Sequence, residues 1–517
     1  MEMRVDPVAV DPFDARCALE AKARASAARR REPYLDAGRC NPDWLSAVPR
    51  EAFFLLGRCA CEALTRRNHL AHRQWRDGPE AGHFLEGYLH ARHHDPAALW
   101  LRQALDWAEA QLGMDRHLLA GELLEAALGA RYPEPAAILP AVERLCRAHL
   151  ARALAWPEAQ AAATRLFATE GSTAAVCDLF ASLLTRGLLT RGDRVAVITP
   201  AYSPYLELLH QPRMALELEC LELPVAHGGT HQPSAADLDR LRDPRVRLLV
   251  VVNPGNPLPD ALDEISIGHI EEVVSNGRSD LLILSDEVYA PLAPGRPTLS
   301  ARLPHNTLGV FSFSKFFGAT GWRLGLVCVA ADHLVDRLAG HRSGDGDEPA
   351  PLPPGDFLTQ LVADSRAGAF RHTAGLSTPQ QAQMALFALS ALLDAEDRHG
   401  RAVRDSLAAR RQALWQGLGF PAPLVPGHTG FYELLSLPGL VARWMGDHAA
   451  FEFDSATVTA RVLERLAGDH GVVALPGAGF QAPVGTIRLC LANLSPPLAQ
   501  RLGEAIREAC LADEGAA

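Results

Sequence analysis

Only two side chains of this protein can supply an aliphatic amine, Lys22 and Lys315, because the other 48 strongly basic residues are arginines. Arginine stays protonated and cannot replace an amine nucleophile. Lys315 lies in SFSKFFGATGWRLG (312–325), in which a strand ends, a glycine-rich turn follows and Arg323 comes eight residues after the lysine. These residues suit a phosphate-bearing aldehyde, because Lys315 can form a Schiff base while Ser312 and Arg323 hold the phosphate dianion.

Two upstream segments could complete a phosphate and ring site. EGSTAAV (170–176) places Ser172 and Thr173 directly before a predicted helix, where backbone amides and hydroxyls attract an anion. A simple helix N-cap would have the same pattern. TPAYSPY (199–205) puts Tyr202 at the end of a predicted strand, where its ring could stack on a flat ligand or pack only within a loop.

Two more segments follow buried apolar strands. NPGNP (253–257) contains Asn256, which could donate a hydrogen bond to a phenolic oxygen or could simply belong to a turn. SDEVY (285–289) contains Asp286 and Tyr289. A carboxylate at the carboxyl end of a parallel strand lies where such sheets bind ligands. Asp286 could pair with a protonated pyridine nitrogen and keep the ring an electron sink, and Tyr289 could share the phenolic oxygen.

The order of these segments resembles the class I and II aminotransferases, the fold-type I pyridoxal-phosphate (PLP) enzymes. The resemblance implies a catalytic lysine at 315, a pyridinium partner at Asp286 and phenolate partners at Asn256 and Tyr289. It also implies that PLP is the cofactor. Phosphate and ring contacts would come from the remaining cofactor residues, Ser172, Thr173, Tyr202, Ser312 and Arg323.

Further residues gain roles only through the resemblance. Tyr132, in ARYPEPAAILPAVERL (130–145), is similar to a tyrosine that reaches the phosphate of a neighbouring subunit. Arg488, in GTIRLCLANL (485–494), is similar to the arginine that binds the substrate α-carboxylate. The segments at 37–57, 361–389 and 472–480 resemble the aspartate 4-decarboxylase branch, which is also described as bifunctional aspartate aminotransferase and aspartate β-decarboxylase. In that branch, arginines matching Arg39 and Arg366 lie near the substrate.

The hydrophobic pattern predicts an α/β protein of the fold-type I class. Continuous apolar runs at 194–200, 246–254, 280–286, 308–314 and 324–330 alternate with helical stretches, which indicates a large, mostly parallel sheet covered on both faces. We expect residues 1–60 to join a smaller domain and 61–395 to form the large PLP-binding domain. That domain would carry a helical N-terminal insertion and a mobile loop at 340–356. Residues 396–517 would form the smaller α+β domain.

Composition narrows the class of protein. A net charge of −11 gives no reason to expect nucleic acid or an anionic membrane as a partner. We find neither a long apolar span nor a signal-peptide pattern, and ten scattered cysteines suit a reduced compartment, so a cytoplasmic enzyme is expected. HARHHD (90–95) matches no strong metal motif, and no metal is predicted.

We expect the first of three reactions, and the other two remain alternatives. The first is aspartate 4-decarboxylation, which gives alanine and CO2, accompanied by aminotransferase activity. The second is transamination without decarboxylation. The third is a specialised PLP enzyme that uses a Cβ or Cγ carbanion for substitution or carbon–carbon bond formation. The resemblance also implies a homodimer or larger assembly with shared active sites and a small amino-acid substrate.

Overall fold

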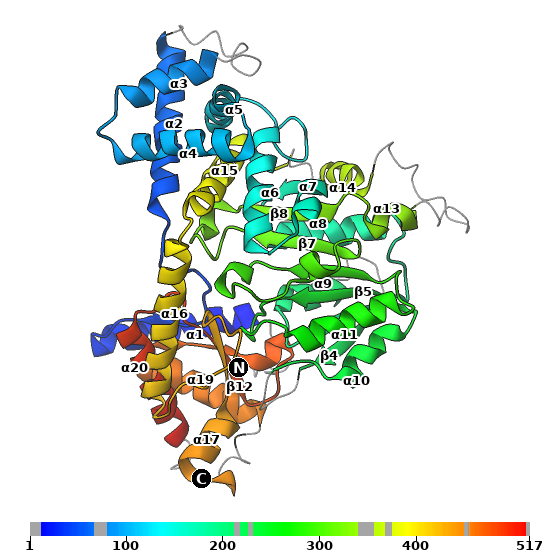
Figure 1. Cartoon of the computed structure of the whole chain (residues 1–517). Coiled ribbons are helices and arrows are strands. Elements are labelled where there is room, and N and C mark those ends of the chain that lie inside the picture. The colour runs from blue at the N-terminus through cyan, green and yellow to red at the C-terminus, as the bar shows by residue number, and fades with distance from the viewer. Residues whose placement is uncertain are drawn as a thin grey trace.

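The computed structural model describes residues 12–66, 80–210, 218–225, 231–339, 356–367, 375–448, 453 and 455–512. The loop expected at 340–356 lies outside these residues except for Asp356, whose carboxylate caps the helix that follows it. A large sheet occupies the middle of the molecule, a group of helices lies at one end, and the two chain termini lie toward the other end (Figure 1).

Seven strands form the large sheet, in the order β2-β8-β7-β6-β5-β3-β4. Only β8 runs antiparallel to its neighbours, so the mostly parallel sheet that we predicted is confirmed. The two edge strands, β2 and β4, were not predicted; β4 is partly exposed and lacks a continuous apolar run. The strands are β2 (Thr164–Thr169), β3 (Arg194–Thr199), β4 (Glu219–Pro224), β5 (Val246–Val252), β6 (Leu282–Asp286), β7 (Thr307–Ser312) and β8 (Gly325–Ala330).

Both faces of this sheet are covered because the central strands are apolar on both sides. In β5, Leu248 and Val250 join a core with α8 (Ser172–Thr185) and α14 (Phe357–Arg366). Leu249 and Val251 pack on the opposite face with α11 (Glu264–Ser275). Successive side chains of a strand point to opposite faces, so one continuous apolar run supplies two cores. Shorter helices complete the layers: α7 (Glu158–Ala163), α9 (Ser203–His210), α10 (Ala235–Asp239), α12 (Leu299–Arg302) and α13 (Leu334–Ala339).

A separate group of helices packs on the side of the sheet that carries β8 and β7. Their apolar faces share one core with Leu326 and Phe313, near the lysine loop. The predicted helical region therefore does not stand alone but supports the strands that carry Lys315. The helices are α2 (Ala47–Arg66), α3 (Glu80–His90), α4 (Pro96–Leu112), α5 (Arg116–Leu128), α6 (Pro140–Ala153) and α15 (Thr378–Leu393).

Residues 378–417 form two helices that are separated at Asp394. Its carboxylate accepts hydrogen bonds from the amides of Arg398 (2.9 Å) and His399 (2.8 Å), which satisfies the first donors of α16 (Arg398–Gly417). In Figure 1, α16 leads from the helical group toward the end of the molecule that holds the termini.

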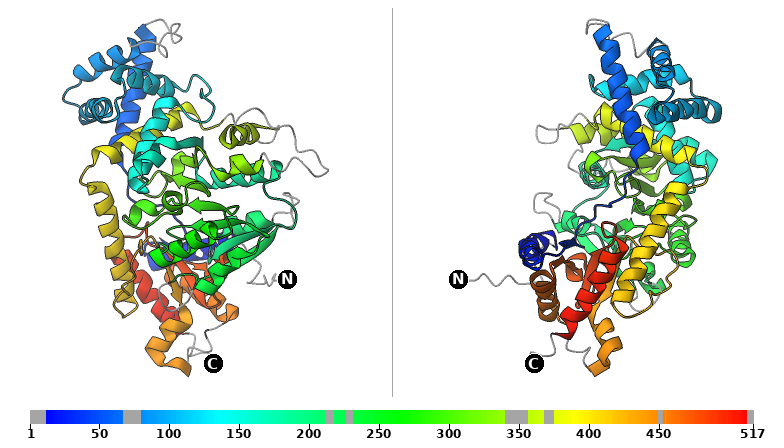
Figure 2. Two further views of the ribbon diagram at one scale, coloured as in Figure 1. Left: turned by 45° about the vertical axis from the view of Figure 1, so that its right-hand side comes forward. Right: turned by 90° about the vertical axis from the view of Figure 1, so that its left-hand side faces the viewer.

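The beginning and the end of the chain form one smaller unit. Helix α1 (Pro12–Arg30) packs beside α19 (Ala456–His470), and β1 (Leu35–Asp36) pairs with β10 (Val472–Val473). Figure 2 shows this N-terminal helix among the C-terminal elements. The other members are β9 (Tyr432–Ser436), α17 (Leu437–Met445), β11 (Leu475–Pro476), β12 (Thr486–Cys490) and α20 (Pro496–Leu511), with β11, β12 and β9 in one antiparallel sheet.

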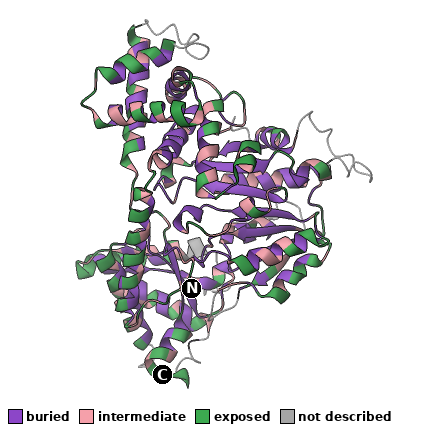
Figure 3. Ribbon diagram, in the orientation of Figure 1, coloured by how far each residue is buried: buried purple, intermediate pink, exposed green. Residues whose placement is uncertain are grey.

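The chain passes from this smaller unit to the helical group earlier than expected. Residues up to Asp36 pair with the C-terminal strands, whereas α2, which begins at Ala47, packs in the core of the helical group. The boundary expected at residue 60 therefore falls inside a continuous helix. Buried residues concentrate in the sheet and at the helix contacts, and exposed residues lie on the outer helix faces (Figure 3). Within the described ranges, no helix combines the length and apolarity needed to cross a bilayer.

Two helical glycines, one in the smaller unit and one beside the large sheet, test how tightly their helices are packed. A Cβ at Gly503 of α20 would collide with the backbone of α16 at the Leu414 carbonyl and would lie 2.8 Å from the Leu418 nitrogen. We expect Gly503→Ala to lower the free energy of unfolding by about 1–3 kcal/mol. A Cβ at Gly268 of α11 would meet no atom within 4 Å, so Gly268→Ala should raise stability by about 0.5–1 kcal/mol. Urea unfolding measures both; equal effects would contradict this account.

Candidate active site

Most of the predicted site residues surround one cavity of about 450 Å³ at the carboxyl ends of β5, β6 and β7. This is the edge at which open parallel sheets bind ligands. Asp286 ends β6 and Ser312 ends β7, so strand length alone places both at this edge. The predicted residues that line the cavity are Arg39, Ser172, Thr173, Tyr202, Asn256, Asp286, Tyr289, Ser312, Lys315 and Arg323.

The N-terminal segment holds the loop that carries Lys315. Trp44 donates its indole N–H to the carbonyls of Lys315 (3.1 Å) and Phe316 (3.0 Å), and Arg50 donates to the Gly318 carbonyl (2.8 Å). Lys315 is half-buried, and its Nζ donates to the carbonyl of Cys40 at 3.0 Å. The amine is therefore fixed at the cavity wall by residues that are about 270 positions away in the sequence.

Asp286 is a buried carboxylate with two hydrogen-bond donors. The Tyr205 hydroxyl donates to its Oδ2, and the Val288 amide donates to its Oδ1 at 3.2 Å. Burial raises the pKa of Asp286 to about 6, although the Tyr205 hydrogen bond acts in the opposite direction. A cationic ring nitrogen beside this carboxylate would restore its charge, because opposite charges stabilise each other when buried.

A second tyrosine joins Tyr289 at the cavity wall. The hydroxyls of Tyr289 and Tyr432 lie 2.6 Å apart, and burial raises the pKa of both phenols well above the usual value. Both therefore remain protonated donors at neutral pH. Asn256 is buried nearby, and its Oδ1 lies 3.4 Å from Nη1 of Arg488.

The opposite end of the cavity is built for an anion. Arg323 donates to the carbonyls of Thr320 (3.1 Å) and Glu170 (3.3 Å), so its fork is held at the N-terminus of α8. Gly171 has a φ of 89°, and a Cβ there would lie 2.5 Å from Nη2 of Arg323. Glycine therefore allows the arginine to approach Ser172 and Thr173, whose hydroxyls do not cap α8. Ser312 and Ser314 complete this end, with their hydroxyls 2.8 Å apart.

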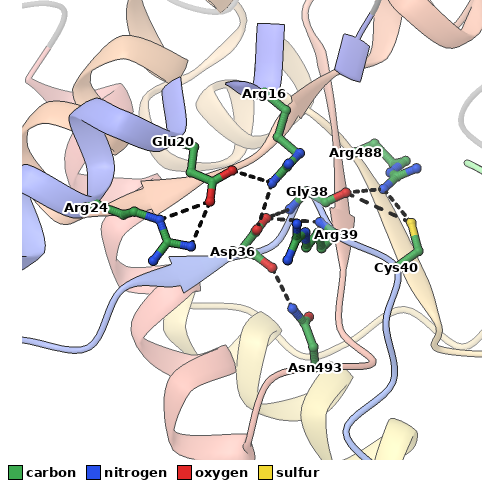
Figure 4. Close-up of polar contacts among 9 residues, drawn as sticks. All are labelled: Arg16, Glu20, Arg24, Asp36, Gly38, Arg39, Cys40, Arg488 and Asn493. Atoms are coloured by element: carbon green, nitrogen blue, oxygen red, sulfur yellow. Dashed lines mark hydrogen bonds and ion pairs between the residues drawn. The ribbon is translucent and has the colours of Figure 1, made fainter. Parts of the chain in front are cut away.

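Two further arginines stand near the lysine. Arg488 is completely buried and contacts the Gly38 carbonyl (2.8 Å) and the Cys40 sulfur (3.0 Å). Arg39 is exposed at the cavity and forms no ion pair with any carboxylate of the described ranges. Arg16 also lines the cavity, but its charge is taken by Glu20 and Asp36 (Figure 4).

Two of the residues predicted for the site lie elsewhere in this chain. Tyr132 is 78% exposed and does not line the cavity. Arg366 ends α14, and its Nη2 donates to the Ala136 carbonyl at 2.5 Å. The cavity wall formed by the described residues thus lacks both, and any contact of Tyr132 with a phosphate would have to involve a second subunit.

Sequence reasoning missed several residues of the site: Tyr432 and Cys40 line the cavity, whereas Tyr205 is buried and does not line it. Tyr432, on β9, places its phenol beside that of Tyr289. Tyr205, in α9, donates a hydrogen bond to Asp286. Cys40 directly follows Arg39, and its position in the cavity wall depends on how the N-terminal segment docks. Tyr205 stands three residues after the predicted Tyr202, a helical spacing that could have marked it. Nothing local marks Tyr432 or Cys40.

These residues fit PLP as the resident cofactor. The glycine-lined cradle beside Arg323 suits a phosphate, because a Cβ at Gly171 would fill it. The buried Asp286 would hold the pyridine nitrogen, and the amine of Lys315 would hold the aldehyde carbon. The Asn256 amide and the Tyr289 hydroxyl would hold the phenolic oxygen.

The raised pKa of Asp286 predicts a pH-dependent stability of the cofactor-free chain. An unfolded aspartate titrates near pH 4, so between about pH 4 and 6 the folded state binds more protons than the unfolded state. Stability relative to Asp286→Asn should therefore be greatest below pH 4 and fall by on the order of 2 kcal/mol as the pH rises through 6. Denaturant unfolding of both chains from pH 3.5 to 7.5 measures this; a constant difference would contradict it.

Comparison with known proteins agrees with the geometry. The family model of aminotransferase class I and II matches residues 145–506. A bifunctional aspartate aminotransferase and L-aspartate beta-decarboxylase of a Pseudomonas species is 36% identical over 498 residues, covering 93% of this chain and 92% of that protein. A probable N-succinyldiaminopimelate aminotransferase of Mycobacterium tuberculosis is 28% identical and covers 62% of this chain and 68% of that protein.

Solved structures show the same fold at lower sequence identity. A double mutant of Thermus thermophilus aspartate aminotransferase superimposes with a TM-score of 0.59 at 20% identity, covering 98% of this chain and 99% of that one. N-succinyldiaminopimelate aminotransferase from Mycobacterium tuberculosis gives 0.59 at 19% identity, covering 99% of both chains. The predicted fold class and family are confirmed: this chain is a PLP-dependent enzyme that belongs to the class I and II aminotransferases.

Proposed function

We propose that this enzyme acts on L-aspartate, releasing its β-carboxylate as CO2 to give L-alanine and also transferring its amino group. The observation that carries the proposal is the pair of arginines beside Lys315. Arg488 is buried and contacts Cys40, the residue whose carbonyl accepts from Lys315, and Arg39 stands exposed at the cavity that the lysine lines, with no carboxylate partner in the described ranges. Two separate guanidinium groups suit a substrate with two carboxylates.

The Pseudomonas relative supports this choice of substrate. That protein is named for two activities, aspartate transamination and L-aspartate β-decarboxylation, and the two proteins align over more than nine-tenths of their lengths. Transamination is common to the family, whereas loss of CO2 from the β-position belongs to that relative. Decarboxylation therefore depends on how the β-carboxylate is held, and Arg39 is the residue that we assign to it.

Each cavity residue has a distinct task in this reaction. PLP, when bound, supplies an electron sink for the pair released at Cα or Cβ of the substrate. Lys315 would take the proton from Cα, since its Nζ is the amine at the cavity wall. Arg488 would orient the α-carboxylate, and Asp286 would keep a proton at the ring nitrogen.

The β-carboxylate needs a weaker hold than the α-carboxylate. A tight ion pair would stabilise the charged ground state more than the transition state and so raise the barrier to CO2 loss. Arg39 meets this requirement because water reaches its side chain, and water screens an exposed charge. Arg488, shielded from water, is suited to the carboxylate that remains.

We also propose that two copies share their active sites, as is general in the family. The exposed Tyr132 would then contact the phosphate of the partner subunit, outside the cavity of its own chain. Apolar side chains exposed near the start of α2 are consistent with a covered surface: Leu45 is 64% exposed and Phe54 is 61% exposed.

Product analysis tests the proposed reaction. Holoenzyme incubated with L-aspartate should release CO2 and L-alanine in equal amounts, and 2-oxoglutarate should allow oxaloacetate to form. Lys315→Ala should lose at least about a thousandfold of either rate, because the proton-transfer group is gone. Oxaloacetate without alanine would remove decarboxylation from the proposal. If neither product forms, aspartate is excluded as the substrate, and a bond-forming reaction on another amino acid is favoured.

Arg39→Met tests recognition of the side chain. Losing this water-exposed contact should raise KM for aspartate about two- to fivefold, because an exposed ion pair contributes roughly 0.2–1 kcal/mol, while transamination of alanine, which has no β-carboxylate, should not change measurably. Arg24→Met is the matched control, since Arg24 pairs with Glu20 and does not line the cavity. Equal changes for aspartate and alanine would show that Arg39 does not read the side chain.

A further inference from the structure

Arg488 carries a positive charge in a place that water does not reach. It lies on β12 with no exposed surface, and the rings of Tyr432 and Phe480 cover its faces at 4.8 and 4.9 Å. Its Nη2 donates to the Gly38 carbonyl and the Cys40 sulfur, and its Nε has no hydrogen-bond partner among the described residues (Figure 4).

Other buried arginines of this protein are neutralised by carboxylates. Arg186 pairs with Asp364 at 2.5 Å, and Arg410 pairs with Asp43 at 2.7 Å. Arg488 has no such partner within the part of the chain that the structure describes, and the acidic groups that act on it are Cys40, Tyr432 and Cys490. A buried charge without a counter-charge costs several kcal/mol, so a negative charge on one of these groups would stabilise the guanidinium.

Cys40 is the group best placed to be the anion. Its sulfur is 3.0 Å from the guanidinium and lies at the cavity, whereas Cys490 is completely buried. Tyr432 also lines the cavity, but burial raises the pKa of its phenol, so it keeps its proton. The Cys490 thiol lowers the pKa of Cys40 most, followed by the charges of Arg488 and Lys315 and a hydrogen bond from Tyr432, against the opposing effect of burial. Burial raises the pKa of Cys490 itself well above its usual value, so Cys490 remains a protonated donor.

We propose that Cys40 is a thiolate that serves as the resident counter-ion of Arg488, and that the α-carboxylate of the substrate displaces it. The inference deepens the proposed function, because it depends on Arg488 binding a carboxylate. When a carboxylate takes the guanidinium, the thiolate loses its partner and takes up a proton at Sγ. The other charged and titratable groups that act on this sulfur or share its cavity are Arg16, Arg39, Tyr202, Asp286, Tyr289 and Lys315.

This arrangement makes Cys40 a modification site for small soft electrophiles. With iodoacetamide, the thiolate forms an S–C bond while the C–I bond breaks and iodide leaves, and no base is needed. The adduct would remain beside Arg488 where the substrate carboxylate binds. Alkylation of one cysteine should therefore abolish activity.

Alkylation of the holoenzyme tests the charge state. At pH 6, iodoacetamide should modify Cys40 at least tenfold faster than Cys17 or Cys61, two exposed thiols on α1 and α2 that serve as internal controls. Peptide mass spectrometry measures all three rates. Succinate, a dicarboxylate probe, should slow the reaction at Cys40 alone. Loss of activity should follow the Cys40 adduct, and whatever activity Cys40→Ser retains should survive the reagent.

Binding of succinate gives a second readout. Its affinity for the wild-type enzyme should fall up to tenfold per pH unit between pH 6 and 8, since each molecule bound takes up a proton. Cys40→Ser should lose this dependence. The proposal is overturned if Cys40 is alkylated no faster than Cys61 at pH 6, or if succinate does not protect it. If the enzyme turns over aspartate but Cys40 reacts no faster than the exposed thiols, only the Cys40 inference is overturned. If Cys40 reacts fast and succinate protects it, but aspartate is not turned over, only the proposed substrate is overturned.

Discussion

The docking of the N-terminal segment on the Lys315 loop is the contact on which the active site depends. Trp44 binds the backbone of Lys315 and Phe316, the Cys40 carbonyl accepts from the lysine amine, and the Gly38 carbonyl accepts from Arg488. The segment also joins the two parts of the molecule, since Asp43 pairs with Arg410 of α16. Residues 38–44 thus set the position of Lys315 relative to Arg488.

Burial of polar groups gives this site its chemistry. Asp286 loses solvation and its pKa rises, so it gains stability when a cation lies beside it. Tyr289 and Tyr432 remain protonated for the same reason. Arg488 must find a negative charge from the protein or from the substrate. A cationic nitrogen beside Asp286 would offset the cost of burying its carboxylate, and a carboxylate beside Arg488 would offset the cost of burying its guanidinium. Binding of such groups is therefore favoured by the charges that the fold buries.

The phosphate end and the substrate end of the cavity differ in how they are built. Ser172, Ser312 and Arg323 lie close to strand ends or at the start of a helix, so short segments of backbone position them. Arg488, Cys40 and Tyr432 come from the smaller unit and the segment before α2. The cofactor end is therefore fixed by the large sheet, whereas the substrate end depends on how two parts of the chain pack together.

Local sequence was sufficient for five of the seven strands of the large sheet, but not for its edge strands β2 and β4. It also placed Lys315, Asp286, Asn256 and Ser312 at one cavity, because each follows an apolar run whose end in a parallel sheet is a ligand edge. It was insufficient for Tyr432, for Cys40 and for the break at Asp394. Packing between distant elements put Tyr432 beside Tyr289 and ended the N-terminal part of the smaller unit before α2. It also left Arg366 bound to the Ala136 carbonyl and Tyr132 exposed. Sequence determines which residues end strands; only the tertiary structure decides which side chains share a cavity and which of them lose their contact with water.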